Sequence, residues 1–568
     1  MSAAARALRL HHHHHHQRTL CFFSGTRPAA LRQPHWSSLR HFASSHRRSR
    51  IAEPHFTSAK HSAIDPRTFL IAAVLSFAVA YTTIAYSGKE EAPRQQLAEE
   101  VSPIPAFALG AEPAFYTMAA NNLPGRPGNL TADQETKLKE MWATNLEFFG
   151  MSHEEVSEAQ ANGTLNPSRT PTSPETTPKK KKGGMLSRLR GKNKEEEEPS
   201  SPTVGIDNDK HGQVKEYEEA LASMSPDQIQ EAFWNMTKHD HPDAILLRFL
   251  RARKWDVHAA QVMALSTLHW RLKDMHVDDD IMIRGEGHAI EQSKSDNASE
   301  KKLGEDFLAQ MRMGKSFLHG LDKDGRPCCY VRVRLHHGGE QCQESLERFT
   351  VYTIETARMM LRPPVDTATI VFDMTDFSMA NMDYTPVKFM IKCFEANYPE
   401  SLGSVLVYKA PWIFSGIWKI IKGWLDPVVA GKVHFASNEK ELEEWIPRSR
   451  IPKEMGGDED WEYKYVEPNE GEDAELGKTE EKAPLLAERK ELTKAYESAT
   501  LAWIKGEDRT AERNELAEKM AVNYWKLDPY IRARSLYDRT GIIGPMGKLD
   551  IYADKKQCSE EQNHGEVD

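Results

Sequence analysis

The chain has 568 residues, of which 28% are charged and 39% hydrophobic, and its formal net charge is -10. This composition leaves room for one well-packed domain with long polar flanks, and the negative charge argues against a general nucleic-acid binder. The 6 cysteines form no CxxC pair and show no repeated spacing, so they predict neither a zinc site nor a disulfide framework.

The amino-terminal region, residues 1–67, is a basic, targeting-like segment. Residues 1–52 are rich in Arg, Ser, Ala and His and contain no Asp or Glu, as is typical of a mitochondrial transit peptide. A start codon assigned too far upstream is the alternative explanation. Residues 68–88 carry no charge and, at about 1.5 Å per residue, reach roughly the 30 Å of a bilayer's hydrocarbon core. They predict a single transmembrane helix.

Residues 89–213 are predicted to form a mostly disordered linker with a short helical element near residues 130–149. The low-complexity part, residues 163–212, joins Pro-rich and Gly-containing sequence to a run of four lysines and a run of four glutamates. Such opposed charge blocks cannot bury a core, so a solvated linker is favoured over contact of the lysines with anionic lipid.

A helical lobe is predicted over residues 214–305. Apolar residues three and four apart indicate helices over 242–255 and 256–275, and Asp256 stands where it would cap the second helix. The polar stretch 286–302 indicates a loop insertion.

An α/β pattern follows the helical lobe. A turn over residues 320–327 precedes the apolar run CCYVRV, which indicates a hairpin, and residues 345–361 form an amphipathic helix pattern. The short apolar runs 369–374 and 404–410 resemble strands buried on both faces. This alternation predicts an α/β fold with a mainly parallel sheet flanked by helices. Residues 471–568 predict a charged helical carboxy-terminal extension.

Catalytic motifs are missing from the sequence. Gly314-Lys315-Ser316 resembles the end of a phosphate-binding loop, but Ala309 stands where the first glycine is required. The sequence contains no GxSxG elbow, HExxH motif or kinase signature. It therefore predicts no enzymatic activity, no metal and no cofactor.

The stretch KAPWIFSGIWKIIKGWLDPVVAGKVHF, residues 409–435, concentrates apolar side chains between two proline corners. On a helix over residues 412–425 these side chains occupy one side, and Lys419 and Lys422 lie opposite. The pattern is too short and too one-sided to span a bilayer. It favours either an amphipathic core helix or a movable apolar wall that meets lipid. The apolar stripe comprises Ile413, Ile417, Ile420, Ile421 and Trp424, widened by Phe414, Trp418 and Leu425.

The sequence contains four ordered motifs: LLRFLRARKWDV (246–257), ANYPESLGSVLVYKAPWIFSGIWKII (396–421), WLDPVVAGKV (424–433) and IPKEMGG (451–457). Together they resemble the CRAL-TRIO family, and more closely its fungal phosphatidylinositol transfer proteins. The resemblance covers about residues 215–470 and implies a small helical lobe followed by a lipid-binding lobe over 306–470. The sheet of that lobe would form the floor of a lipid-sized pocket, closed by a mobile gate helix.

The resemblance also implies residue roles. Arg253 and Lys254 would approach the headgroup and phosphate, while Glu400 and Lys432 would form a charged pair near the same headgroup. The family's phosphatidylinositol binders usually have threonine where this chain has Val429, so the resemblance implies a lipid pocket more strongly than a preference for inositol. The gate and apolar wall would consist of Trp412, Ile413, Phe414, Ile417, Trp418, Ile421, Trp424 and Leu425.

These features imply a non-enzymatic protein that binds phosphatidylinositol or another phospholipid. It would exchange that lipid between membranes or present it to lipid-modifying enzymes such as lipid kinases. One alternative is a binder of squalene, sterol or another isoprenoid, and another is a membrane-anchored scaffold or tether with a vestigial pocket. The expected partners are membrane lipids and the membrane surface, with no nucleic acid.

The expected location depends on the start of translation. If translation starts at Met1, residues 1–88 predict a mitochondrial inner-membrane protein. Because residues 124–142 resemble the usual amino terminus of the fungal subgroup, a start near Met118 is the alternative, and it predicts a cytosolic protein that is peripheral on membranes.

Overall fold

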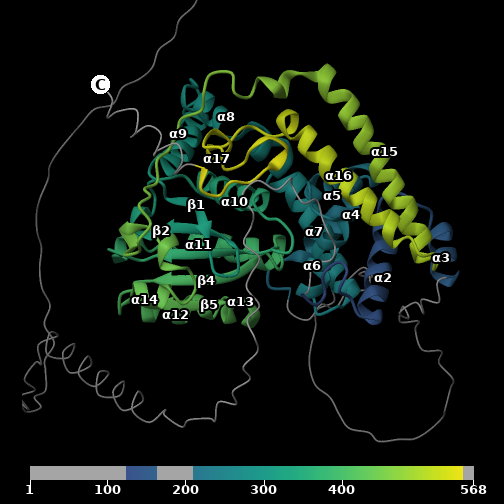
Figure 1. Ribbon diagram of the computed structural model, residues 1–568, viewed down its shortest axis with the longest axis horizontal. Coiled ribbons are helices and arrows are strands. Elements are labelled where there is room, and N and C mark those ends of the chain that lie inside the picture. The colour runs from purple at the N-terminus through teal and green to yellow at the C-terminus, as the bar shows by residue number, and fades with distance from the viewer. Residues whose placement is uncertain (1–122, 163–208, 554–568) are drawn as a thin grey trace, which may run out of the picture. The chain divides into compact units, whose positions relative to one another are not determined.

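The computed structural model describes residues 123–162 and 209–553 (Figure 1). The targeting-like segment, the transmembrane helix predicted over 68–88 and most of the predicted linker lie outside these ranges. The predicted mitochondrial location depends on these segments, so the structure does not address it. Residues 554–568 also lie outside the described ranges. Within the described ranges, no helix combines the length and hydropathy needed to cross a membrane.

The first lobe is helical. Asp256 begins its last helix by accepting a hydrogen bond from the amide of Ala259. The preceding helix ends at Ala252, three residues before the predicted end, because Lys254 (φ 51) and Trp255 (φ 67) are left-handed. The helices of this lobe are α2 Ala132–Phe148, α3 His153–Asn162, α4 Gln213–Ser223, α5 Pro226–Thr237, α6 Pro242–Ala252 and α7 Val257–His269.

The loop predicted over residues 286–302 is wrong, because this stretch forms most of a helical hairpin, α8 Ile283–Ser293 and α9 Ala298–Arg312. Asn297 caps α9 by accepting hydrogen bonds from the amides of Ser299 and Glu300. Gly304 allows the two helices to touch, since a Cβ there would lie 2.4 Å from the carbonyl oxygen of Ala289. Polar composition misled the prediction because residues 286–302 contribute little apolar surface, and the hairpin packs into the core mainly through Phe307, Leu308 and Met311 further along α9.

Five strands form one sheet in the order β1-β2-β3-β4-β5. β1 and β2 form the predicted antiparallel hairpin, and the remaining neighbours are parallel. The α/β class and the mainly parallel sheet are therefore confirmed. The strands are β1 Ser316–Leu321, β2 Pro327–Arg332, β3 Ala368–Asp373, β4 Leu402–Tyr408 and β5 Val433–Ala436.

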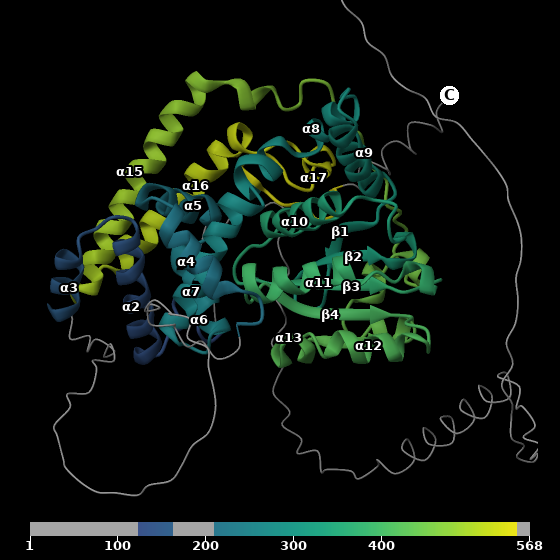
Figure 2. The same cartoon turned by 180° about the vertical axis from the view of Figure 1, so that it is seen from behind.

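Alternate strand residues point to two different environments. Val371 and Leu406 pack into a solid core with α14 Glu439–Leu442 and the chain that follows it. Ile370 and Val405 point to the opposite face, where they line a cavity. Figure 2 shows the helices that cross between the parallel strands on this face. They are α10 Gln343–Met359, α11 Tyr384–Lys392, α12 Phe414–Lys422 and the short α13 Pro427–Gly431.

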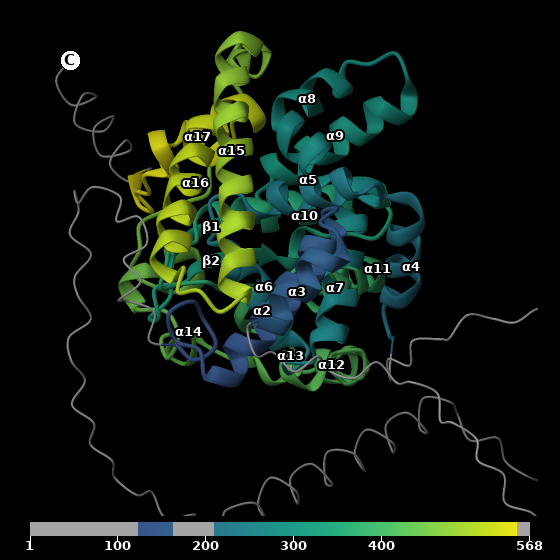
Figure 3. The same ribbon diagram turned by 90° about the vertical axis from the view of Figure 1, so that its right-hand side faces the viewer.

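As far as residue 553, the predicted carboxy-terminal extension packs into the fold. It contains α15 Thr479–Ile504, α16 Thr510–Ile531 and α17 Leu536–Arg539. α15 and α16 lie side by side, and α2 lies against α15 (Figure 3). The buried carboxylate of Asp243 joins these segments. It accepts hydrogen bonds from Trp142 Nε1 (2.7 Å), the hydroxyl of Tyr496 (3.0 Å) and the guanidinium of Arg513 (2.6 Å).

Candidate functional site

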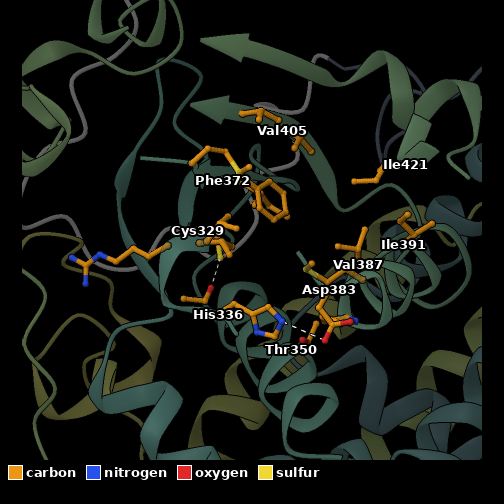
Figure 4. Close-up of a pocket in the computed structure, with 18 of the residues that line it drawn as sticks. Cys329, His336, Thr350, Phe372, Asp383, Val387, Ile391, Val405 and Ile421 are labelled. Atoms are coloured by element: carbon orange, nitrogen blue, oxygen red, sulfur yellow. Dashed lines mark hydrogen bonds and ion pairs between the residues drawn. The ribbon is translucent and has the colours of Figure 1, made fainter. Parts of the chain in front are cut away.

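A cavity of about 260 Å³ lies between the sheet and its crossover helices (Figure 4). Strands β2, β3 and β4 supply its floor, α10 and α11 form two walls, and α12 forms a third. Most of the lining is apolar, and the side chains include Val331, Leu346, Phe349, Ile354, Ile370, Phe372, Val387, Met390, Ile391, Val405, Val407, Val429 and Val433.

Helix α12 has an apolar face toward the cavity and a second apolar surface toward solvent. Phe414, Trp418 and Ile421 line the cavity, and Ile417 is buried beside them. Ile420 is 48% exposed, contrary to the predicted stripe. The buried side of the helix is centred between Phe414 and Ile421, and at 3.6 residues per turn position 420 lies about 110° from that centre.

The residues just before α12 extend its exposed apolar surface. Trp412 is 87% exposed and Ile413 is 39% exposed, so neither belongs to the cavity wall. The turn that leads into them follows Lys409, whose φ of 51 lies in the left-handed region. Its amide still donates to the carbonyl oxygen of Ala436 at 2.8 Å, which fixes the start of this segment to β5.

The other end of α12 is fixed by Glu395. Its Oε1 accepts a hydrogen bond from the amide of Asp426 at 2.6 Å, and its Oε2 lies 2.8 Å from His211 Nε2. Trp424 packs edge-on against Tyr384 of α11, with ring centroids 5.2 Å apart, and does not line the cavity. Leu425, the next residue, does line it.

Two of the predicted headgroup residues lie together. Lys432, at the end of α13, has its Nζ 3.8 Å from the carboxylate of Glu400, and both side chains are about a quarter exposed. Glu400 has a left-handed backbone (φ 53), and its carbonyl oxygen accepts a hydrogen bond from Arg248 at 2.7 Å. The neighbouring Val429 and Val433 line the cavity, so this pair lies beside the cavity wall.

Arg253 and Lys254 have different surroundings. The half-buried guanidinium of Arg253 donates to Gln213 Oε1 at 2.5 Å. Burial lowers the pKa of Arg253, and the nearby carboxylate of Asp426, at the start of α13, opposes that shift. Lys254 is exposed. Arg253 therefore faces the start of α13, while Glu400 contacts its end.

A polar group at one end of the cavity escaped the sequence analysis. Figure 4 shows His336, Thr350 and Asp383 together there, with Val405 and Ile421 at the opposite end. Lys315 also lines the cavity, and its pKa is lowered to about 8 by burial. The only sequence signal was a lysine directly before an apolar strand, in the tripeptide dismissed above as an incomplete phosphate-binding loop.

Comparison with known proteins gives consistent matches. The sequence model of the CRAL/TRIO domain matches residues 311–457, and that of the CRAL/TRIO N-terminal domain matches residues 213–264. A CRAL-TRIO domain-containing protein of Schizosaccharomyces pombe is 43% identical over 425 residues, covering 74% of this chain and 93% of the relative. The phosphatidylinositol transfer protein CSR1 of Eremothecium gossypii is 37% identical over 459 residues, covering 75% of this chain and 100% of the relative.

Proposed function

The chain belongs to the CRAL/TRIO domain family, and on that premise we propose that it is a non-enzymatic lipid carrier. It binds one membrane lipid in the cavity beneath α12 and exchanges it between membranes or presents it to a lipid-modifying enzyme. The observation that carries this proposal is the apolar cavity itself, whose lid is a single short helix with a second apolar surface on the outside. The relative CSR1, named as a phosphatidylinositol transfer protein, supports phosphatidylinositol as the first cargo to test.

An apolar cavity lowers the main barrier to lipid transfer. Each methylene contributes about 0.8 kcal/mol to the preference of an acyl chain for apolar surroundings. The transfer of a phospholipid with about thirty methylenes from a bilayer into water therefore costs roughly 20 kcal/mol or more of free energy. Side chains such as Phe349, Phe372 and Val407 replace the bilayer around the chains and cancel most of this cost.

Helix α12 acts as the gate in this proposal. Its start is fixed to β5 next to Lys409 and its end is fixed to Glu395, so the helix between these points can swing away from the sheet. Contact with a membrane favours the open form, because the exposed surface of Trp412, Ile413 and Ile420 then leaves water for the bilayer interface.

The headgroup lies, in this proposal, along α13. Lys432 lies at the end of this helix, and the carboxylate of Asp426 at its start favours the charged form of Arg253. Both cationic side chains can donate charge-assisted hydrogen bonds to a phosphoinositol headgroup. Glu400 holds Lys432 in place until the lipid arrives, and the exposed Lys254 adds positive charge at the entrance.

A transfer assay between vesicles tests the headgroup site, with labelled phosphatidylinositol as cargo. Arg253→Ala and Lys432→Ala should each slow transfer about tenfold, as expected for the loss of one hydrogen bond between charged groups. Lys323→Ala, which removes an exposed lysine on the β1–β2 hairpin, serves as the matched control. Unchanged transfer in both variants would remove the headgroup role, and no transfer by the unaltered protein would favour a scaffold with a vestigial pocket.

Val429 supports a second candidate cargo, an isoprenoid such as squalene or a sterol. This side chain lines the cavity. The family's phosphatidylinositol binders usually have threonine at this position, and valine lacks the threonine hydroxyl that could donate a hydrogen bond to a phosphate. Mass spectrometry of lipid that copurifies with the chain separates the two cargoes, because an isoprenoid carries no phosphate. A cargo without phosphate would also leave transfer insensitive to Arg253→Ala.

A further inference from the structure

The ammonium group of Lys315 lines the cavity without an anionic partner. Lys315 joins α9 to β1 and is only 6% exposed. Its Nζ donates one hydrogen bond, to Oε1 of Gln341 at 2.7 Å, and within residues 123–162 and 209–553 no carboxylate pairs with it. An ammonium carries three donors, so the hydrogen-bonding capacity of this group is mostly unused.

The neighbours of Lys315 compensate its charge only in part, because burial outweighs the favourable effect of the carboxylates of Glu340, Asp383 and Asp306. The positive charge of Lys315 helps to lower the pKa of His336, an effect that adds to burial and shows that the two groups are close. Nε2 of His336 is buried and lies 3.5 Å from Oδ2 of Asp383, at the outer limit of a hydrogen bond. Asp383 itself caps α11 by accepting a hydrogen bond from the amide of Thr385 at 2.9 Å.

A buried charge of this kind is costly unless something pairs with it. Removing an ammonium from water costs several kcal/mol, and the loss is recovered only by a counter-ion and by good hydrogen bonds. One hydrogen bond to the neutral amide of Gln341, with carboxylates that make no direct contact, supplies this only in part. The cavity thus carries a positive site that a negatively charged ligand would complete.

This site is separate from the proposed headgroup site on α13. Lys315 directly precedes β1, and Lys432 directly precedes β5, at the opposite edge of the sheet. Four strand spacings of about 4.8 Å place these edges roughly 19 Å apart. A single headgroup cannot reach both lysines, whereas an acyl chain lying along the cavity floor can connect the two ends.

We propose that the end of the cavity lined by Lys315 and His336, here called the inner end, binds the carboxylate of a single-chain fatty acid through these two side chains. The chain lies against the apolar side chains of β3 and α10, such as Phe372 and Phe349. A carboxylate fits better than a phosphate because one ammonium balances one negative charge, and the carboxylate of Asp383 nearby would repel a dianion. This inference rests on the proposed lipid cavity and adds a ligand class to it.

The test compares the binding of cis-parinaric acid with the binding of its methyl ester. Both ligands are added to the full-length protein, and their fluorescence at pH 7 measures binding. The unaltered protein should bind the acid about tenfold more tightly than the ester, as expected for a hydrogen bond to a charged group. Lys315→Met should bind the acid and the ester equally, with the affinity for the ester unchanged. Lys323→Met, which removes an exposed lysine of the β1–β2 hairpin, should keep the tenfold preference.

Each outcome has a separate meaning. Equal binding of acid and ester by the unaltered protein, or a preference that survives in Lys315→Met, overturns the inner site. Absence of ester binding overturns the lipid cavity instead. If Lys315→Met fails to fold, Lys315→Gln replaces it, because glutamine is neutral and keeps a hydrogen-bond donor. Competition by palmitic acid and by hexadecyl phosphate separates the two anions, and stronger competition by the phosphate overturns the carboxylate assignment.

Discussion

The carboxylate of Glu395 accepts the amide hydrogen of Asp426 at 2.6 Å, and this bond fastens the chain directly after the gate helix. The second oxygen of the same carboxylate faces Lys210 at 2.5 Å and His211 at 2.8 Å. Lys210 also donates to the carbonyl oxygen of Trp424. One acidic side chain thus holds together the end of the gate and the residues that lead into α4.

Removing this carboxylate should loosen the gate. Glu395→Ala deletes the acceptor for the amide of Asp426 and leaves Lys210 without its anion, so the open form becomes less costly. We expect the release of a fluorescent phosphatidylinositol to acceptor vesicles to accelerate at least threefold, which corresponds to a loss of about 0.7 kcal/mol in the closed form. Glu467→Ala, which removes an exposed carboxylate paired with Arg312, is the control and should release lipid at the normal rate. An unchanged rate in Glu395→Ala would show that Glu395 does not restrain the gate.

The exposed tryptophan before the gate should anchor the protein to membranes. Trp412→Ala removes a side chain that is 87% exposed, so the free energy of unfolding should change by less than about 0.5 kcal/mol. Partition onto phospholipid vesicles should fall roughly tenfold, because burial of a large apolar side chain contributes about 1.5–3 kcal/mol. Sedimentation with vesicles measures this.

Leu486→Ala provides the comparison for that measurement. Leu486 is also exposed, at 45%, but it lies on α15 rather than beside the gate. Equal losses of vesicle binding in Trp412→Ala and Leu486→Ala would mean that no particular face of the protein meets the membrane.

Much of the fold could be predicted because its central elements depend on local apolar patterns. The run TIVFDM contains most of β3 and the run SVLVYKA most of β4, since both strands are buried on their two faces. The helical hairpin over α8 and α9 was missed because its buried Glu286 bonds to distant groups. Tyr352 donates to Glu286 at 2.7 Å and the amide of Leu536 donates at 3.0 Å. Long-range partners of this kind leave no periodic trace in a sequence.

The site was predictable to a similar degree. The resemblance indicated Glu400 and Lys432 as a pair, and their side chains lie 3.8 Å apart. It did not indicate Lys315, because no pattern in the sequence shows that α9 and β1 bring this lysine against the same cavity. Helical periodicity alone also misassigned Ile420, since the centre of a helix face depends on what the helix packs against.

The buried carboxylate that joins four helices should matter for stability. Asp243→Asn leaves the guanidinium of Arg513 buried without its anion, and loss of one partner of a buried ion pair typically costs about 3–5 kcal/mol. Burial by itself would raise the pKa of Asp243, but the charges of Arg513 and His241, together with hydrogen bonds from Arg513 and Trp142, lower it overall. Urea denaturation measures the loss. Asp324→Asn, which removes a 64% exposed partner of Arg326, should cost less than about 1 kcal/mol. Similar losses in the two variants would contradict the special role of Asp243.

Binding of a fatty acid at the inner end of the cavity should depend on pH. In the free protein burial lowers the pKa of Lys315 from its ordinary 10.5 to about 8, while Glu340, Asp383 and Asp306 act in the opposite direction. The ammonium is therefore present at pH 7 and lost as the pH rises. A bound carboxylate favours the charged form, so the midpoint of the loss should lie between about 8 and 10.5.

The ratio of acid to ester affinity should consequently fall from about ten at pH 7 toward one above this midpoint. His336 does not reproduce this change, because burial and the charge of Lys315 lower its pKa from 6.5, so its own titration falls at lower pH. Binding of cis-parinaric acid and its methyl ester, measured in parallel from pH 6 to pH 10.5, checks the ratio. The ester serves as the internal control, since any general loss of cavity structure at high pH would weaken both ligands. A ratio that stays constant across this range would show that the ammonium of Lys315 does not hold the carboxylate.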